Sequence, residues 1–330
     1  MPDQRRRVTS VQVAQLSGVS RATVSYVLNG TPNQTISAPT RRRVFDAAES
    51  LGYTPYAPAR ALRSGRSDMV LLLIPEWPIG PAIARLVEEL TRALAAAGLT
   101  LVVHAHPRNA RPVHDLWKAI TPAAVINHQA LDEAEVGAAR RAGIPVVAPV
   151  FQFAGRASFA DFQQGVGHAQ AAHLCSAGHR RLGYALPDDE RLAAFADPRL
   201  AGARAACADL GLAEPMAHTV PLDRIGASTA VRAWRRARIT AVCAYNDEVA
   251  LAVLAGLRHR HLTAPAQLAV VGVDDIPAGA LADPALTTIA TGMSALGRHL
   301  AAAVVAVLQG EPAAPGPGPE IIRLVRRASA

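Results

Sequence analysis

Three short polar segments of the sequence could together recognise a small molecule through hydrogen bonds. Asn246-Asp247 and Asp274-Asp275 each follow an apolar run that is typical of a strand, and Arg199 follows another such run and a loop. Ligands of parallel α/β sheets bind beyond the carboxyl ends of the strands. A guanidinium group, an amide and a carboxylate suit the hydroxyl groups of a polyol. Asn246 and Asp274 are also well placed to cap helices, and that structural role stays open.

Trp77 is a further candidate for ligand contact, because an indole ring can stack on the face of a sugar. It lies just after the apolar run Met69–Ile74, where a surface aromatic is an equally good interpretation. No GxGxxG or P-loop pattern follows a strand, so we expect no dinucleotide or triphosphate site and no cofactor. No pairing of a nucleophile with a base stands out, although an enzyme on an α/β scaffold remains an alternative.

The histidines and cysteines do not predict a metal centre. His104/His106 and His259/His261 lack a third and fourth ligand at a convincing spacing, so we expect solvated histidines. The cysteines are odd in number and far apart in the sequence, which favours small core side chains over disulfides: Cys175, Cys207 and Cys243. Every apolar run falls short of the roughly 18 residues that span a bilayer. We expect a cytoplasmic chain without a membrane partner.

Positive charge is concentrated at the beginning of the chain. Residues 1–66 contain ten arginines and three acidic residues, whereas the other 264 residues carry 24 basic and 23 acidic side chains. A basic segment on a neutral body is typical of a protein that binds a polyanion. Lys118 is the one lysine, so a general preference for arginine is real, but it does not explain why the excess lies at one end.

The basic segment has the pattern of three short helices. Thr9 and Ser20 are candidate caps of the first two helices, and Gly18 allows a tight turn between them. A third helix is expected from about Ser37 to Gly52. The predicted shared core of the first two helices consists of small and aliphatic side chains: Val13, Leu16, Val19, Val24, Val27 and Leu28.

Two helices joined by a glycine turn resemble a helix-turn-helix, whose second helix enters the major groove of DNA. Arg21, Ala22, Ser25 and Tyr26 would face outward from that helix. Arg21 could read guanine, whereas Ala22 could contact only a thymine methyl group. A three-helix bundle that makes no groove contact is the alternative.

The remaining chain alternates apolar runs with alanine-rich helical stretches. The expected strands are Met69–Ile74, Leu99–Val103, Ala123–Ile126, Ile144–Val147, Leu182–Leu186, Ala241–Ala244, Leu268–Val273 and Glu320–Val325. Strands that are apolar on both faces and alternate with helices indicate a doubly wound parallel sheet.

Two stretches of the first 66 residues resemble the LacI/GalR family of repressors. VTSVQVAQLSGVSRATVSYVLN (8–29) is similar to the family's head, and LGYTPYAPARAL (51–62) to its connection into a hinge helix. The resemblance implies a homodimer on a pseudo-palindromic operator. The residues that it places at the major groove are Thr9, Ser20, Arg21, Ala22, Thr23, Ser25, Tyr26 and Asn29. Tyr26 replaces an arginine usual in the family, so the operator is expected to differ there.

The resemblance also implies a hinge helix at about 58–64 that lies in the minor groove of the operator. Leu62 would wedge between the two central base pairs and kink the duplex, and Ala59 and Arg60 would line the same groove. Leu62 could instead be a contact between the paired hinge helices of a dimer. Tyr56 replaces the asparagine that usually precedes this helix, which leaves Pro58 as the main start signal.

The similarity continues through the body. HLCSAGHRRL (173–182), RLAG (199–202), ND (246–247), VGVDDI (271–276) and LTTI (286–289) resemble motifs of the family. They imply a two-lobed, periplasmic-binding-protein-like domain, in which the effector is bound by Arg199, Asn246 and Asp274. The loop with Trp77 and the residue Phe162, where asparagine is usual, depart from the family pattern, so the effector is poorly constrained.

We therefore predict an all-α helix-turn-helix head (1–57), a hinge and linker (58–66) and an α/β effector domain (67–330). The two lobes of that domain would comprise about 67–160 with 292–319, and about 161–291 with 320–330. The function predicted is that of a repressor controlled by a sugar-like effector. A dimer is expected, because no heptad segment of the tetrameric family members follows the last strand. A small-molecule sensor with a vestigial head is the alternative.

Overall fold

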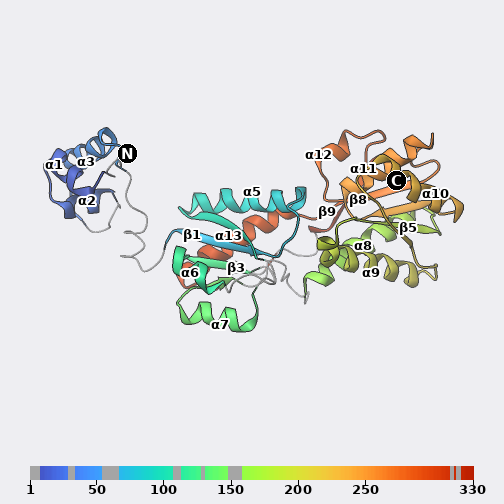
Figure 1. Cartoon of the computed structure of the whole chain (residues 1–330), viewed down its shortest axis with the longest axis horizontal. Helices are drawn as coiled ribbons and strands as arrows, with labels where there is room; N and C mark the ends of the chain where they lie inside the picture. The colour runs from blue at the N-terminus through green and yellow to red at the C-terminus, as the bar shows by residue number, and fades with distance from the viewer. Residues whose placement is uncertain are drawn as a thin grey trace, which may run out of the picture. The chain divides into compact units, whose positions relative to one another are not determined.

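The structure is a computed structural model. It describes residues 8–28, 34–53, 67–106, 113–127, 131–147, 158–312, 316 and 321–330. The chain divides into two compact units, Met1–Ser67 and Asp68–Ala330, which we call the head and the body (Figure 1). The predictions for Asn29 and for the hinge residues Ala59, Arg60 and Leu62 fall outside the described residues.

The head consists of the helices α1 (Ser10–Ser17), α2 (Arg21–Leu28) and α3 (Ala38–Ser50). The backbone N–H of Thr9 donates to Gln12 Oε1 at 2.8 Å, which closes a capping box at the start of α1. Gly18 has a φ of 68° between α1 and α2, a left-handed conformation that glycine adopts without strain. The helix starts and the turn are therefore encoded locally.

The head core confirms most of the predicted apolar side chains and corrects one. Val13, Val24 and Val27 are buried against α3, but Leu16 is 58% exposed. The buried face of α1 consists of Val13, Ala14 and Ser17. Position 16 flanks that stripe, three residues after Val13, and its side chain extends into solvent.

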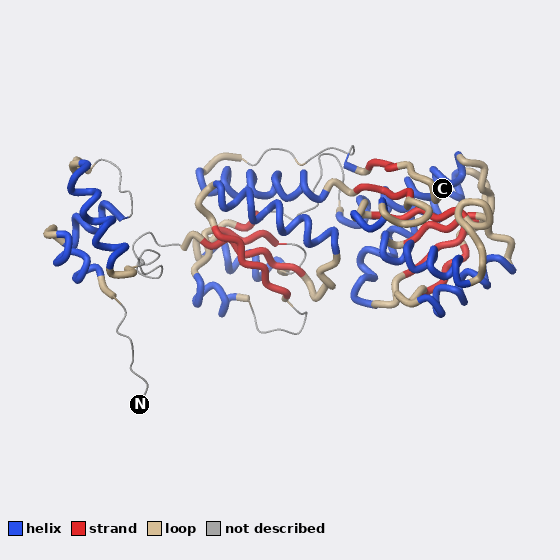
Figure 2. The backbone as a smooth tube through the Cα atoms, turned by 90° about the horizontal axis from the view of Figure 1, so that it is seen from above, coloured by secondary structure: helices blue, strands red, loops and turns tan. Residues whose placement is uncertain are grey.

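The first sheet of the body has four parallel strands in the order β2-β1-β3-β4. Its strands are β1 (Met69–Ile74), β2 (Thr100–Ala105), β3 (Ala124–Asn127) and β4 (Val146–Val147). Its helices are α5 (Pro81–Ala96), α6 (His114–Ile120), α7 (Glu133–Arg141) and, from late in the sequence, α13 (Met293–Gln309). Alternate side chains of β1 enter two different cores, one with α5 and one with α6 and α7, so helices cover both faces (Figure 2).

The second sheet has six strands in the order β10-β9-β8-β7-β5-β6. The strands are β5 (Leu182–Leu186), β6 (Met216–Thr219), β7 (Ala241–Ala244), β8 (Ala269–Val273), β9 (Thr287–Ala290) and β10 (Arg323–Val325). The helices are α8 (Phe159–Ser176), η1 (Glu190–Leu192), α9 (Ala193–Asp209), α10 (Arg224–Arg236), α11 (Asp247–His259) and α12 (Pro277–Ala280). All pairs are parallel except β9 with β10.

The predicted fold class, a helical head followed by a parallel-rich α/β body, is confirmed. Two strands of the second sheet were not predicted. They are β6, a short edge strand with an exposed or half-buried pattern rather than an apolar run, and β9, which begins with two threonines. Among the described residues, no helix is both long and apolar enough to span a membrane. We call the first sheet with its helices the N-lobe and the second sheet with its helices the C-lobe.

Two glycines let α8 and α9 approach until their backbones touch. A Cβ atom on Gly167 would overlap the carbonyl of Arg199, and one on Gly202 would overlap the carbonyl of Gln164. Each glycine therefore accommodates the backbone of the other helix. This contact sets the position of the first turns of α9, from which Arg199 projects.

We expect Gly202→Ala to lower the free energy of unfolding by about 1–3 kcal/mol, because neither backbone can move away without separating the helices. Chemical unfolding of the full chain measures the change. Gly137→Ala in α7 is the matched control, since its Cβ would meet only the flexible end of Arg141. That control should be neutral or stabilising by about 0.5–1 kcal/mol. Equal effects of the two substitutions would contradict the close contact.

Candidate ligand pocket and nucleic-acid interface

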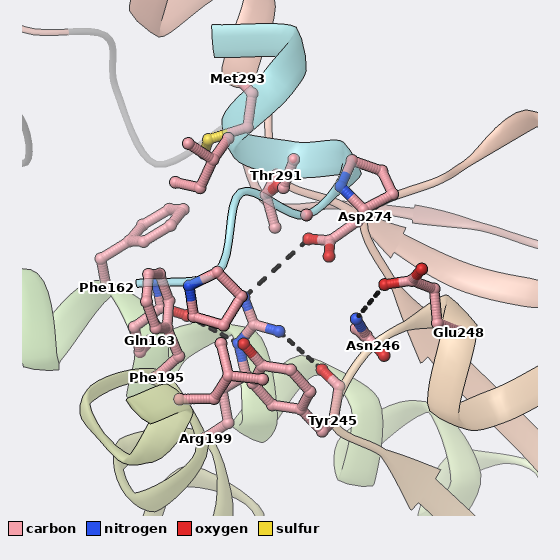
Figure 3. A pocket seen from close by; sticks show the side chains of 16 residues that line it. Phe162, Gln163, Phe195, Arg199, Tyr245, Asn246, Glu248, Asp274, Thr291 and Met293 are labelled. Atoms are coloured by element: carbon pink, nitrogen blue, oxygen red, sulfur yellow. Dashed lines mark hydrogen bonds and ion pairs between the residues drawn. The ribbon is translucent and has the colours of Figure 1, made fainter. Parts of the chain in front are cut away.

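A pocket lies between the lobes, beyond the carboxyl ends of β7 and β8 (Figure 3). The N-lobe and α13 contribute Pro78, Gly80, Pro81, Ala82, Ile83 and Met293. The C-lobe and the connection to α13 contribute Phe162, Gln163, Leu192, Phe195, Arg199, Tyr245, Asn246, Glu248, Asp274 and Thr291. The structure thus brings together Arg199, Asn246 and Asp274, three of the four residues predicted to contact a ligand.

Arg199 forms the charged floor of the pocket. Its side chain is almost fully buried, and its Nε donates to Gln163 Oε1 at 2.7 Å while Nη1 donates to the carbonyl of Tyr245 at 2.6 Å. The guanidinium carbon lies 4.9 Å from the centre of the Tyr245 ring. Nη2 faces Asp274 Oδ1 at 3.9 Å, which is beyond hydrogen-bond length.

Asp274 supplies a buried carboxylate opposite that free edge of the guanidinium. Its Oδ1 is buried without a hydrogen-bond partner among the described residues. Burial raises the pKa of this carboxyl, while Arg199 and Arg85 act to lower it. A ligand hydroxyl between the two groups could accept from Arg199 Nη2 and donate to Asp274 Oδ1.

Asn246 has a structural role at the same place. Its Oδ1 accepts from the backbone N–H of Val249 at 2.9 Å and caps α11, and its Nδ2 donates to Glu248 Oε2 at 3.3 Å. The cap fixes the amide at the pocket wall. Glu248 adds a second carboxylate that the sequence analysis did not single out, although it directly follows the Asn246-Asp247 pair.

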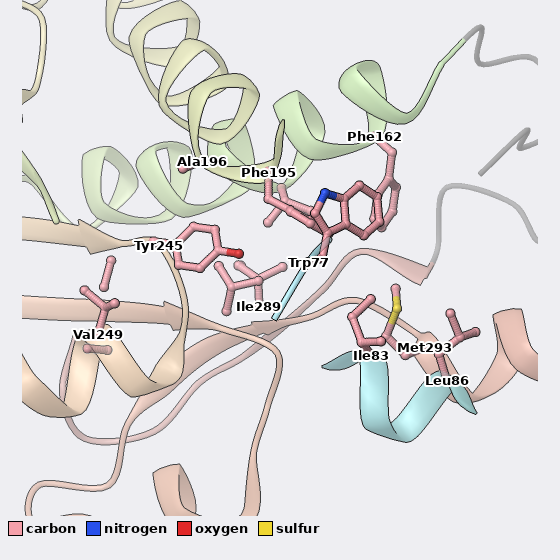
Figure 4. Close-up of a cluster of buried hydrophobic side chains, with 14 of the residues drawn as sticks. Trp77, Ile83, Leu86, Phe162, Phe195, Ala196, Tyr245, Val249, Ile289 and Met293 are labelled. Carbon is pink, nitrogen blue, oxygen red and sulfur yellow. The ribbon is translucent and has the colours of Figure 1, made fainter. Parts of the chain in front are cut away.

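Aromatic rings form the apolar wall of the pocket. Phe162, Phe195 and Tyr245 line it, whereas Trp77 does not. The Trp77 indole is buried, stacks on Phe159 with ring centres 5.7 Å apart, and meets Phe195 edge-on at 4.5 Å (Figure 4). The prediction for Trp77 is corrected in this respect. Its indole does not line the pocket but packs against Phe195, a ring that does.

The loop that carries Asp274 is clamped from the N-lobe. Arg85 of α5 donates from Nη1 to the carbonyl of Asp274 at 3.3 Å and from Nη2 to that of Asp275 at 3.2 Å. Arg327 pairs with the Asp275 carboxylate at 2.6 Å. Asp274 and Asp275 have φ values of 103° and 53°, a left-handed region that costs energy for residues other than glycine. Partners on both lobes hold this strained turn in place.

Asp247 anchors the same loop from beneath. Its buried carboxylate accepts from the backbone N–H of Ile276 at 2.8 Å and from Thr288 Oγ1 at 2.6 Å. Gly272 lies against it, with no room for a Cβ atom. Burial raises the pKa of Asp247 to about 7, against the two hydrogen bonds, which act to lower it.

The head presents a polar face on α2. Arg21 and Ala22 are exposed, and Ser25 and Tyr26 are half-buried. Ser20 Oγ accepts from the backbone N–H of Thr23 at 3.1 Å, so part of the polar groups predicted for DNA contact also caps the helix.

Comparisons with known proteins match both units of the chain. Residues 11–56 match the family model for bacterial regulatory proteins of the lacI family, and residues 171–330 match that for a periplasmic binding protein-like domain. The chain is 31% identical to the HTH-type transcriptional regulator CelR of Thermobifida fusca, over 95% of each chain. It is 30% identical to the regulator MalR of Streptomyces coelicolor, over 91% of this chain and 90% of that protein.

Solved structures show the same architecture. A Lac repressor dimer bound to operator and the anti-inducer ONPF matches with a TM-score of 0.77 at 23% identity, over 98% of this chain and 99% of that one. A CelR–cellobiose complex matches with a TM-score of 0.61 at 27% identity, over 98% of this chain and 100% of that one.

The buried Asp247 predicts a pH dependence of stability. Its pKa is raised from 3.8 to about 7 by folding, so the folded protein binds a proton that the unfolded chain has lost in this range. Stability should therefore decrease as pH rises from about 4 to about 7, by on the order of 3 kcal/mol. Asp247→Asn should remove this slope, because an amide does not titrate. The variant should still fold, since its amide can accept from the N–H of Ile276 and donate to Thr288 Oγ1.

Unfolding free energies at several pH values measure the effect. Asp283→Asn is the control, since Asp283 is exposed and should keep the wild-type slope. If the slopes of wild type and Asp247→Asn are equal, the carboxyl of Asp247 does not titrate as described.

Proposed function

The chain belongs to the LacI family of bacterial DNA-binding transcriptional regulators, and on this premise we propose that it is a repressor controlled by a sugar or sugar derivative. It would bind a pseudo-palindromic operator as a homodimer. The observation that carries the effector proposal is the facing pair of Arg199 Nη2 and Asp274 Oδ1, buried 3.9 Å apart in the pocket.

Hydroxyl-rich ligands fit this pocket better than anions. A hydroxyl can both accept from Arg199 and donate to Asp274, whereas a ligand carboxylate would meet the side chains of Asp274 and Glu248. Phe162, Phe195 and Tyr245 offer an apolar surface to the ring of a sugar. The similar CelR, solved with cellobiose, supports a carbohydrate.

The head supplies the proposed operator contacts. Arg21 and Ala22 at the start of α2 are positioned to reach base edges in the major groove, with Ser25 and Tyr26 behind them. Thr9, Ser20, Thr23 and Asn29 would contact the duplex near them, and Ala59, Arg60 and Leu62 would act in the minor groove.

Exposed apolar side chains of the C-lobe support a dimer. Leu281 is 86% exposed, and Leu222 and Ile225 are each about two-thirds exposed at the start of α10. An interface with a second copy of the chain would remove these side chains from water. The similar Lac repressor was solved as a dimer.

The proposed wedge gives a test of operator recognition. We expect Leu62→Ala to weaken binding to the duplex upstream of the protein's own gene by about tenfold or more, because the kink would lose its intercalating side chain. Binding to a random duplex should change little, since it depends on phosphate contacts. Fluorescence anisotropy with both duplexes measures the difference.

The exposed Leu210 provides the control, because Leu210→Ala removes the same atoms from the body. It should leave both affinities unchanged. A Leu62→Ala protein with intact specific affinity would exclude the wedge. A wild-type protein that binds no duplex would exclude the repressor function itself.

The pocket gives a test of effector control. We expect Asp274→Asn and Arg199→Lys to weaken effector affinity by about 10- to 100-fold, because the first removes a charged acceptor and the second removes the guanidinium that presents Nη2, and such a charged hydrogen bond is worth about 1.5–3 kcal/mol. Calorimetry with a panel of mono- and disaccharides, cellobiose included, measures the affinity. The operator shift caused by the effector should disappear in the same variants, while operator binding without effector persists.

Asp283→Asn serves as the matched control, because it removes an exposed carboxylate from the same lobe. Effector affinity that stays at the wild-type value in Asp274→Asn would show that the ligand does not contact this carboxylate.

A further inference from the structure

Seven exposed arginines gather at the edge of the C-lobe sheet where its parallel strands begin. They are Arg180, Arg181, Arg235, Arg236, Arg238, Arg258 and Arg260, which we call the arginine edge. This edge is opposite the ligand pocket, which lies beyond the carboxyl ends of the same strands. The body as a whole is almost neutral, with 24 basic and 23 acidic residues, so the concentration is local.

The strand register places these arginines side by side. Leu182, Ala241 and Ala269, at the starts of β5, β7 and β8, are direct neighbours in the sheet. The N–H of Thr240 donates to the carbonyl of Arg181 at 3.1 Å, which joins the segment before β7 to the segment before β5. Arg235 Nη1 donates to the carbonyl of Gln267 at 2.8 Å, which joins the end of α10 to the segment before β8. The helices α10 and α11 also pack together (Figure 1).

Carboxylates do not neutralise this surface. Within the described part of the chain, none of the seven arginines forms an ion pair; Arg180, Arg235 and Arg258 donate to backbone carbonyls instead. Two nearby acidic side chains have other partners: Asp209 lies 3.5 Å from His168, and Glu214 lies 3.1 Å from Arg204. Asp283 contacts Arg258 through its backbone carbonyl and not through its carboxylate.

Two helix ends at this edge carry Arg238 and His261 at a left-handed position that is glycine after five other helices of the body, while α6 ends at Thr121 with a φ of 37°. The helices α5, α7, α8, α9 and α13 end with a left-handed glycine followed by a backbone bond that closes the helix: Gly98, Gly143, Gly178, Gly211 and Gly310. After α10 and α11 the same position, with the same hydrogen bonds, is Arg238 and His261, each at a φ of 57°. A residue other than glycine costs about 1 kcal/mol there.

Helix stability explains only part of this arrangement. Arginines in the last turns, such as Arg235 and Arg258, favour the negative end of the helix dipole. The left-handed positions are different, because glycine at 238 and 261 would relieve strain. The location of these two strained residues within an exposed, unpaired cluster favours a binding role for their side chains.

We propose that the arginine edge is a second DNA-binding surface, which binds the phosphate backbone of a duplex independently of the base sequence. The guanidinium group of arginine presents parallel N–H donors that match the oxygens of a phosphate. When unpaired arginines neutralise phosphates, the counterions condensed on the DNA are released, and this release favours binding. The choice of DNA over other polyanions rests on the proposed function, because a regulator bound through its head meets further duplex at high local concentration. The edge would let one protein hold two segments of DNA.

Arginine modification of the full-length protein tests this surface directly. Phenylglyoxal labelling, mapped by mass spectrometry, is compared with and without an excess of a short random duplex. We expect protection of Arg236, Arg238 and Arg260 together with Arg21 in the head. Arg140 and Arg141, exposed at the end of α7, should stay unprotected and are the internal control.

The outcomes separate this inference from the proposed function. Protection confined to the head would overturn the inference and leave the repressor function intact. Protection at neither place would overturn both. Protection of the edge by polyglutamate but not by the duplex would overturn the assignment to DNA and identify an acidic protein as the partner.

The double variant Arg238→Gly/His261→Gly provides a second test that unfolding cannot mimic. We expect it to have a higher midpoint of thermal unfolding than wild type, because strain is relieved at two positions, and to lose protection of Arg236 and Arg260 by the duplex. The variant Arg238→Gly/Arg260→Gln should reduce the salt dependence of total binding by about 0.9 for each phosphate that is no longer neutralised. Arg140→Gln/Arg141→Gln removes as much charge and should leave that dependence unchanged; equal effects would overturn the proposal.

Discussion

The ligand site depends on one buried charge. The guanidinium of Arg199 is removed from water, so each of its donors needs a partner, and removal of a partner would leave a costly unpaired charge. Gln163 and the carbonyl of Tyr245 satisfy two directions, which fixes the plane of the group. The third direction faces Asp274 across a distance too long for a direct hydrogen bond. The protein thereby creates a polar gap of fixed geometry that a hydroxyl group can fill.

The two sides of this gap, Arg199 and Asp274, come from different elements of the fold. Arg199 is positioned by the glycine contact between α8 and α9, while Asp274 is positioned by a strained loop tied to Asp247 below and to Arg85 of the N-lobe. Because Arg85 reaches across to that loop, any movement of Asp274 towards a ligand acts on α5 as well. The contact that completes the site also links the lobes, and a change at the pocket can therefore reach the N-lobe without a separate signalling element.

The sequence predicted what depends on local pattern. The strands β1, β5 and β7 are continuous apolar runs with ends that the pattern locates, and the residues just after β7 and β8 reach the pocket because parallel strands share one carboxyl edge. Contacts between distant segments were not predictable. The positions of Gln163 and Thr291 depend on α8 and on the crossing into α13, and Trp77 differs from the prediction because Phe195, far along the chain, covers it. The short edge strand β6 lacks the apolar run on which the prediction of strands depended.

The C-lobe sheet carries a group of carboxyl side chains at one edge and a group of arginines at the other, and its helices explain why both groups are tolerated. Each helix that precedes or follows its strands begins at the carboxyl edge and ends at the amino edge, so the positive ends of the helix dipoles face the carboxylates of Asp247, Glu248 and Asp274. The negative ends face the arginines of the opposite edge. Residues other than glycine adopt left-handed conformations at both ends, at Asp274 and Asp275 on one and at Arg238 and His261 on the other. On both proposals, the two edges act as two recognition surfaces built on one sheet, one for a neutral polyol and one for a polyanion, and the strained residues at each edge lie where a side chain would contact the ligand.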